Sequence, residues 1–354
     1  MSDEKLAEKV LKPFKEALHF WLAMLNKPTE LSTQIPAAQV EDPLREIIKL
    51  TKLIKAQTTK VGIVYAPKNI LKQSDAVHDT VAELSKTFVF LISALSQLSP
   101  EKVSSLFYTE VAAKSKDLIE TAEAFAEELE LILKNTEEED EEAQTNADTV
   151  NPRLLSVGKM WLLCDGIGEF IEKGNIKFLQ LKTTLNISLI EDGLDEFEEW
   201  VKNPQDMDDD DPFGLDDDFS DEEAPADDKE ADSGDEADNE DIIKFGELWL
   251  KQLKLVKLLF LSINKSLPSV TSGSVIDEIY ATENSIVRCV DKLVVELMMN
   301  NELGDEVEQF DKEFGKSCSS IISILRSVNK TNETKVKWCV SWEAKYKELQ
   351  DAKY

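Results

Sequence analysis

The feature that most constrains this chain is a strongly acidic stretch from Asn203 to Asp241. It holds about 20 acidic side chains against a single base, Lys229, and so carries about −19 of the formal net charge of −31. Such a segment cannot bury enough apolar area to offset its chain entropy, and its like charges repel one another. We therefore expect residues 203–241 to form a disordered acidic linker between two folded parts. The plainer alternative is a solvated linker that only keeps the protein soluble.

A second acidic run leaves the remainder of the chain close to neutral. Glu137 to Asp148 contains seven acids and no base, and we expect a further disordered loop at 136–149. Together the two runs hold about −26 of the net charge, which leaves about −5 for everything else. Neutralising phosphates requires a patch of lysine and arginine, so this balance argues against nucleic acid as a direct partner.

The cysteines and the N-terminal sequence also indicate the cellular compartment. The four cysteines are scattered, without a Cys-x-x-Cys pair: Cys164, Cys289, Cys318 and Cys339. With only two histidines in the chain, we expect no zinc site and reduced, buried thiols. The N-terminus has no basic region followed by an apolar stretch, which argues against a secretory signal. These features indicate a reduced intracellular location, which we interpret as cytoplasm and nucleus.

The most apolar window of the chain is not predicted to span a membrane. It runs from Leu248 to Ile263 and is interrupted by Lys251, Lys254 and Lys257. Three charges in a stretch of this length exclude a span of about 20 apolar residues. We expect no transmembrane helix.

Apolar residues recur three and four apart along most of the remaining sequence, which predicts helices and no sheet. Asp42-Pro43 and Ser99-Pro100 are typical helix starts, with a capping side chain followed by proline. The expected helices lie near 4–26, 43–66, 75–98, 101–135, 152–171, 176–202, 241–266, 274–300, 304–329 and 332–352.

Two of the expected helices lie on either side of a turn at Lys173-Gly174-Asn175. The apolar residues of the helix before the turn are Leu154, Leu155, Val157, Trp161, Leu162 and Cys164. In the helix after the turn, the predicted buried face consists of Leu181, Leu185, Leu189, Leu194 and Phe197. We expect the second helix to turn its apolar face toward a core.

A chain of 354 residues is long for one hydrophobic core, which favours two domains. We predict an all-α protein of two antiparallel helical bundles with short loops, separated by the acidic linker. The expected divisions are an N-terminal bundle at 1–202, the linker at 203–241 and a C-terminal bundle at 242–354.

A catalytic set is not apparent. His19 and His78 lie in helical patterns without a nucleophile nearby in sequence, and structural or surface roles explain both. Gly166-Ile167-Gly168 lacks the third glycine, the preceding strand and the lysine of a nucleotide-binding loop. The Asp cluster at 208–211 lacks the ligand spacing of a calcium loop. We therefore expect a non-enzymatic protein without a metal or cofactor.

Features suited to binding occur inside the acidic stretch. Ser220 and Ser233 are each followed closely by acidic residues, which is typical of acceptor sites for acidophilic kinases, and phosphorylation would add further negative charge. Phe213, Leu215 and Phe219 form an apolar island among the acids, and such islands often dock on a partner. The alternative is that this island folds back onto its own bundle.

An aromatic stripe marks the last expected helix. Trp338, Trp342 and Tyr346 follow each other at spacings of four, beside several lysines. A core stripe with lysines on its wet side explains this pattern. The more specific hypothesis is that the three aromatic residues contribute to partner binding. In that case the acidic linker is attracted electrostatically to these lysines and covers the site.

The order of these features resembles the family of cyclin-D-interacting proteins, in a fungal-type form. Three blocks carry the resemblance: Ala56–Tyr65 with Leu98-Ser99-Pro100; Ile190–Trp200 leading to Asp211-Pro212-Phe213; and Ile242–Ile263 followed by Ile276–Ile279. The resemblance implies an all-helical adaptor of two domains, related in architecture to the vinculin and α-catenin bundles. It also implies partners such as D-type cyclins and helix-loop-helix factors, and negative regulation of cell-cycle progression and transcription.

Two functional hypotheses follow. The first is a monomeric helical adaptor that regulates by binding protein partners. The alternative is an acidic chaperone for histones or other basic proteins, in which the stretch at 203–241 is itself the binding element. The two differ in salt dependence, because exposed charges are screened within about 10 Å at 0.1 M salt.

Overall fold

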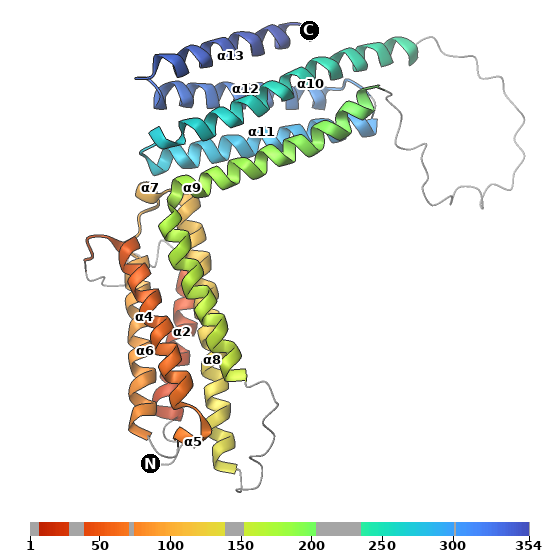
Figure 1. Ribbon diagram of the computed structural model, residues 1–354. Coiled ribbons are helices and arrows are strands. Elements are labelled where there is room, and N and C mark those ends of the chain that lie inside the picture. Colours follow the sequence, from red (N-terminus) through yellow and green to blue (C-terminus); the bar gives the residue numbers. More distant parts are fainter. Residues whose placement is uncertain are drawn as a thin grey trace, which may run out of the picture. The chain divides into compact units, whose positions relative to one another are not determined.

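The computed structural model describes residues 7–27, 39–70, 74–138, 152–202, 235–300 and 302–353 (Figure 1). In these ranges every regular element is a helix, which confirms the all-α prediction. The chain divides into two compact units, an N-terminal unit at Met1–Asn175 and a C-terminal unit at Ile176–Tyr354. Of the regions that we expected to be disordered, 136–149 and 203–241, residues 139–149 and 203–234 lie outside the described residues. Residues 136–138 and 235–241 are helical, so at these edges the expectation is wrong.

The elements of the N-terminal unit are the π-helical η1 (Ala7–Leu11), α2 (Lys12–Leu25), α4 (Pro43–Val64), α5 (Pro67–Ile70), α6 (Ser74–Leu95), α7 (Pro100–Val103), α8 (Ser105–Glu138) and the first part of α9 (Pro152–Lys202). The elements of the C-terminal unit are the rest of α9, α10 (Asp235–Ser266), the short 3-10 helix η4 (Leu267–Ser269), α11 (Gly273–Asn300), α12 (Asp305–Val328) and α13 (Glu333–Asp351).

Local capping explains where two of these helices begin. The Asp42 carboxylate accepts a hydrogen bond from the Arg45 amide at 3.0 Å, with Pro43 at the first helical position of α4. Asn332 caps α13 in the same way, by accepting from the Lys335 amide at 3.1 Å. Each cap satisfies an amide that the helix itself leaves without a partner. The expected start at Asp42-Pro43 is confirmed.

The helix expected at 101–135 differs from the observed one. It is broken at Ser104, which adopts a φ of 94°, so the short α7 ends there and α8 begins at Ser105. The Ser104 hydroxyl then accepts from the Phe107 amide at 3.1 Å and caps α8. The sequence prediction missed this break, because neither glycine nor proline marks it.

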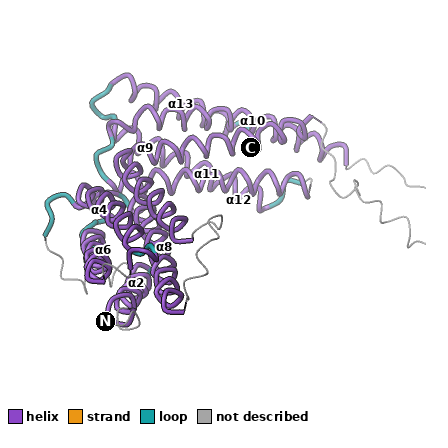
Figure 2. Tube along the Cα trace, turned by 60° about the horizontal axis from the view of Figure 1, so that its bottom comes forward, coloured by secondary structure: helices purple, strands orange, loops and turns teal. Residues whose placement is uncertain are grey.

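The N-terminal unit is a bundle of long helices that lie side by side (Figure 2). Phe14 of α2 contacts Phe88 of α6 across its core, with ring centroids 6.0 Å apart. α9 runs antiparallel to α4, since Lys55 pairs with Asp165 at 2.6 Å while Lys52, earlier in α4, pairs with Glu172. Fully buried aliphatic residues from α4, α6 and α8 fill the interior.

The C-terminal unit packs the second part of α9 against α10–α13. Phe197 of α9 meets Trp249 of α10 edge-on, and Trp249 contacts Phe314 of α12 with centroids 5.6 Å apart. α9 and α10 approach closely at Gly246, where an added Cβ would lie 2.7 Å from a methyl of Val201. This glycine is therefore required for the contact between the two helices.

The observed boundary between the units differs from the expected one at residue 202. The sequence predicts that residues 176–202 belong to the N-terminal bundle, but they pack with the C-terminal unit. Lys254 and Lys257 of α10 pair with Glu198 and Glu191 of α9. The physical reason lies at Gly174, where φ 79° and ψ 169° interrupt the helical backbone of α9.

The buried face of α9 also differs from the expected one. Leu194 and Phe197 are buried as predicted. Leu181, Leu185 and Leu189 are exposed, because the buried positions are taken by a neighbouring set of residues. This set comprises Leu179, Thr183, Asn186, Ile187 and Ile190. Two of its members are polar, so an apolarity pattern alone pointed to the wrong side of the helix.

The backbone at Gly174 gives a first testable prediction. Its φ and ψ lie in a region that is essentially restricted to glycine, and nothing lies within 4 Å of an added Cβ. Gly174→Ala should therefore lower the free energy of unfolding through backbone strain alone, by about 1–3 kcal/mol. Urea denaturation of the full chain, followed by circular dichroism, measures this change.

Gly193→Ala is the matched control within the same helix. Gly193 also has open space around an added Cβ, but its φ is helical. Alanine there should stabilise the protein by about 0.5–1 kcal/mol. Equal changes in the free energy of unfolding for Gly174→Ala and Gly193→Ala would show that the backbone at Gly174 does not require glycine.

Candidate interaction surface

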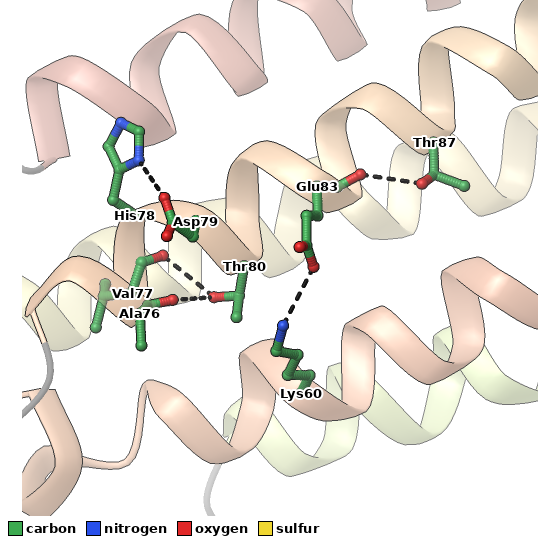
Figure 3. A network of polar contacts seen from close by, with 8 residues as sticks. All are labelled: Lys60, Ala76, Val77, His78, Asp79, Thr80, Glu83 and Thr87. Carbon is green, nitrogen blue, oxygen red and sulfur yellow. Dashed lines mark hydrogen bonds and ion pairs between the residues drawn. The ribbon is translucent and has the colours of Figure 1, made fainter.

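Both histidines lie at the surface of the N-terminal unit. His78 is exposed on α6, and its Nδ1 lies 3.3 Å from a carboxylate oxygen of Asp79 (Figure 3). The neighbouring polar groups serve the helices: the Thr80 hydroxyl donates to the Ala76 carbonyl at 2.9 Å, and Lys60 of α4 pairs with Glu83 of α6 at 3.2 Å. His19 is mostly exposed, with Nδ1 3.7 Å from a carboxylate oxygen of Glu123.

The cysteines are unsuited to nucleophilic chemistry. All four are buried and unpaired with one another. Burial raises the pKa of the Cys164 thiol to about 12 and also raises the pKa of Cys289, Cys318 and Cys339. A thiol with a raised pKa is protonated at neutral pH, whereas the thiolate is the nucleophile. Among the described residues, no cluster of three His, Cys, Asp or Glu side chains is placed to hold a metal ion.

One buried carboxyl group has a strongly shifted pKa. Glu283 of α11 is fully buried, and burial raises its pKa to about 7, against the opposing effect of hydrogen bonds from Thr183 and Asn186. The Thr183 hydroxyl lies 2.8 Å and the Asn186 amide 3.3 Å from its carboxylate oxygens, and both residues belong to α9. These bonds tie α9 to α11 within the C-terminal unit. We therefore interpret Glu283 as a structural group.

The binding residues predicted inside the acidic stretch cannot be placed. Phe213, Leu215, Phe219, Ser220 and Ser233 lie outside the described residues. Their roles as partner contacts and phosphorylation sites stay predictions.

The aromatic stripe of α13 is split between core and surface. Trp342 and Tyr346 are buried and stacked, with centroids 5.0 Å apart, and the Trp342 indole donates to the Leu255 carbonyl at 2.8 Å. Trp338 is 37% exposed. Of the three, only Trp338 lies where a partner could touch it without rearrangement of the core.

The sequence analysis did not single out an apolar surface where α4 meets the first part of α9. Here the Trp161 indole donates to the Thr59 hydroxyl at 3.1 Å, and Gly62 lies so close to Val157 that an added Cβ would come within 2.9 Å of its methyl. The salt bridge between Lys55 and Asp165 continues the same junction along the two helices. These contacts fix the relative position of α4 and α9.

Large apolar side chains stand exposed along this junction. Leu162 is 75% exposed and Ile63, next to Gly62, is 61% exposed. We define the α4–α9 surface as the exposed set Ile63, Leu154, Leu155, Trp161 and Leu162. Single exposed leucines are ordinary, whereas a group of exposed apolar residues on adjoining helices is a candidate site of protein contact.

The sequence analysis listed most of these residues among the apolar residues of one helix, without separating its exposed side from its buried side. Leu154, Leu155, Trp161 and Leu162 are exposed, while Val157, Met160 and Cys164 face the core. The sequence did contain one sign of this exposure, because the apolar residues of this helix cover more than one of its faces. A helix that is apolar around more than one face has more apolar side chains than one core contact can bury.

The described part of the chain contains no helix that is both long and apolar enough to cross a membrane.

Comparison with known proteins gives the wider context. Residues 46–203 match the model of the family "Grap2 and cyclin-D-interacting, N-terminal". The chain is also 25% identical to the uncharacterized protein YLR287C of Saccharomyces cerevisiae, over 98% of either chain. It is 24% identical to the uncharacterized protein C22E12.18 of Schizosaccharomyces pombe, over 90% of this chain and 88% of that protein. The α4–α9 surface lies within the matched range.

The pKa of Glu283 predicts a pH-dependent stability. In the folded state this carboxyl keeps its proton up to about pH 7, whereas the unfolded chain releases it near pH 4.5. The free energy of unfolding that Glu283 contributes should therefore fall as the pH rises from 4.5 to about 7. Glu283→Gln stays neutral, and its stability relative to the original protein should rise over this window by up to about 3 kcal/mol.

Urea denaturation at pH 5 and pH 8 measures this difference. Glu278→Gln removes an exposed carboxylate from the same helix and controls for the change in charge. A Glu283→Gln effect of the same size at both pH values would show that the carboxyl is not protonated in the fold.

Proposed function

We propose that the chain is a non-enzymatic helical adaptor that regulates by binding protein partners, because residues 46–203 match the model of the Grap2 and cyclin-D-interacting family. The name of the family describes proteins that interact with other proteins. The buried, high-pKa thiols and the surface positions of both histidines agree with this function and offer no nucleophile paired with a base.

The observation that carries the proposal is the α4–α9 surface. Its exposed leucines and Trp161 present apolar area on a rigid support, because the hydrogen bond from Trp161 to Thr59 and the close contact at Gly62 hold the two helices together. Interfaces of this kind place apolar and aromatic anchors at the centre and charged pairs at the rim. The pair Lys55–Asp165 supplies such a rim.

We propose a cyclin-type protein as the first partner to test. The family description names cyclin D, and the resemblance of the sequence implies helix-loop-helix factors as a second class. An adaptor of this kind acts by sequestration in the cytoplasm and nucleus, and it thereby restrains cell-cycle progression or transcription without touching DNA. A monomer is sufficient for this role.

The acidic chaperone is the second candidate function. The observation that favours it is the concentration of about 20 acids at residues 203–241. In that case Phe213, Leu215 and Phe219 would add apolar contacts to a basic partner, and phosphorylation of Ser220 and Ser233 would strengthen the attraction. Binding by this route requires the acidic stretch, whereas binding through the α4–α9 surface does not.

Substitutions on the α4–α9 surface test the proposed function. Leu155→Glu combined with Leu162→Glu places two charges on the surface without touching the core, since both side chains are exposed. We expect binding of a purified cyclin from the source organism to weaken at least tenfold, or by about 1.4 kcal/mol. Isothermal titration calorimetry measures the affinity, and thermal unfolding should show an unchanged midpoint.

Leu181→Glu is the matched control, because Leu181 is a comparably exposed leucine on the same helix but in the C-terminal unit. It should leave cyclin affinity unchanged. Retained binding by the double variant, or no binding of any cyclin by the original protein, would count against the proposal.

A further inference from the structure

A second surface lies on the C-terminal unit, where α13 packs against α10. Two hydrogen bonds set the register of these antiparallel helices: the Trp342 indole donates to the Leu255 carbonyl, and the Lys335 ammonium donates to the Lys265 carbonyl, both at 2.8 Å. The α10–α13 surface is defined here by Lys251, Leu258 and Lys265 of α10 and by Lys337 and Trp338 of α13.

The apolar centre of this surface consists of one leucine and one tryptophan. Leu258 lies about one turn after Leu255 on α10, and Trp338 lies one turn before Trp342 on α13. Because the helices are antiparallel, the two residues lie at the same level of the junction. Leu258 is 52% exposed and Trp338 is 37% exposed, so both are available for contact.

The support under this centre is rigid. Trp342 stacks on Tyr346 in the core with an interplanar angle of 10°. Lys353, just after α13, forms a fully buried ion pair with Asp311 of α12. α13 is therefore fixed at its middle and at its end, and Trp338 is held in place without the help of a partner.

Lysines outnumber acids along this part of the two helices, in contrast to the chain as a whole. The nearest acids in sequence to Lys251 and Lys337 are Glu247 and Glu333, each one turn earlier. From Leu248 to Ser266 the sequence contains four lysines and no acid, and from residue 334 to 342 it contains two lysines and no acid. Lys254 and Lys257 are neutralised by Glu198 and Glu191 of α9. Within the described ranges, the ion pairs do not include Lys251, Lys265 or Lys337.

We propose that the α10–α13 surface binds a short acidic segment of a partner protein that carries an aromatic or aliphatic side chain. The apolar side chain of the segment packs against Trp338 and Leu258, and its carboxylates lie near Lys251, Lys265 and Lys337. This surface is separate from the α4–α9 surface and extends the proposed interaction function to a second class of partner.

The number of charges favours a short acidic peptide over a nucleic acid. Binding of a nucleic acid by charge strengthens with the number of phosphates that lysine and arginine neutralise, and this surface offers only three unpaired lysines. A net charge of −31 also repels a long polyanion. The same count disfavours the chain's own residues 203–234, which hold 15 acids and would leave most of them without a partner.

The test uses a fluorescein-labelled dodecapeptide with four glutamates around one phenylalanine and one leucine, and the full-length protein. Fluorescence anisotropy should show saturable binding, and a peptide with glutamine in place of glutamate should bind at least tenfold more weakly. Lys251→Glu combined with Lys337→Glu should lower the affinity at least tenfold, and Trp338→Ala at least fivefold.

Two controls match these variants. Val340→Ala shortens an exposed side chain elsewhere on α13, and Lys159→Glu reverses an exposed charge in the N-terminal unit. Both should leave peptide affinity unchanged.

Three results would overturn the proposal. The first is the absence of peptide binding by both the full chain and a chain that lacks residues 206–232. The second is binding by the shortened chain alone, which assigns the surface to the chain's own acidic residues. The third is tighter binding of single-stranded DNA with the same sensitivity to the three substitutions. Cyclin binding through the α4–α9 surface is measured separately, so none of these results affects the proposed function.

Discussion

The arrangement of this chain depends on one backbone constraint, the conformation of Gly174 in the middle of α9. Its φ of 79° and ψ of 169° are available to glycine but costly for any other residue. The interruption lets one helical segment of 51 residues contribute to two separate cores. Residues before it pack against α4 and α8, and residues after it pack against α10 and α11. Each unit therefore includes one part of α9 in its helical bundle.

The C-terminal unit adds buried polar ties to its apolar core. Glu283 accepts hydrogen bonds from α9, and Lys353 pairs with Asp311, with both side chains completely buried. Burial lowers the pKa of Lys353, and the neighbouring Asp311 opposes that effect. Removing one partner of a buried ion pair costs about 3–5 kcal/mol, because the other charge stays buried alone. These ties fix the positions of α11 and α13, and with them the exposed face around Trp338.

Much of the fold is predictable from sequence, because it depends on patterns among residues that are close together in the chain. The cap at Asp42, the turn at Gly174 and the periodic apolar residues give the helices and their approximate limits. The division between the units was not predictable, since the acidic stretch at 203–241 suggested a boundary that the packing of residues 176–202 does not follow. The α4–α9 surface was missed for a related reason. Leu155 and Leu162 are as apolar as their buried neighbours, and only the packed structure shows which side of the helix a second helix covers.

The central claim is that folded helical surfaces, and not the acidic stretch, bind the regulatory partner. The most direct measurement compares the affinity of the full chain and of a chain without residues 206–232 for the same cyclin-type partner, at 50 and 200 mM salt. The account predicts nearly equal affinities for both chains and a weak dependence on salt. Loss of binding on deletion, together with a steep fall in affinity with salt, would contradict it and would assign binding to the acidic residues.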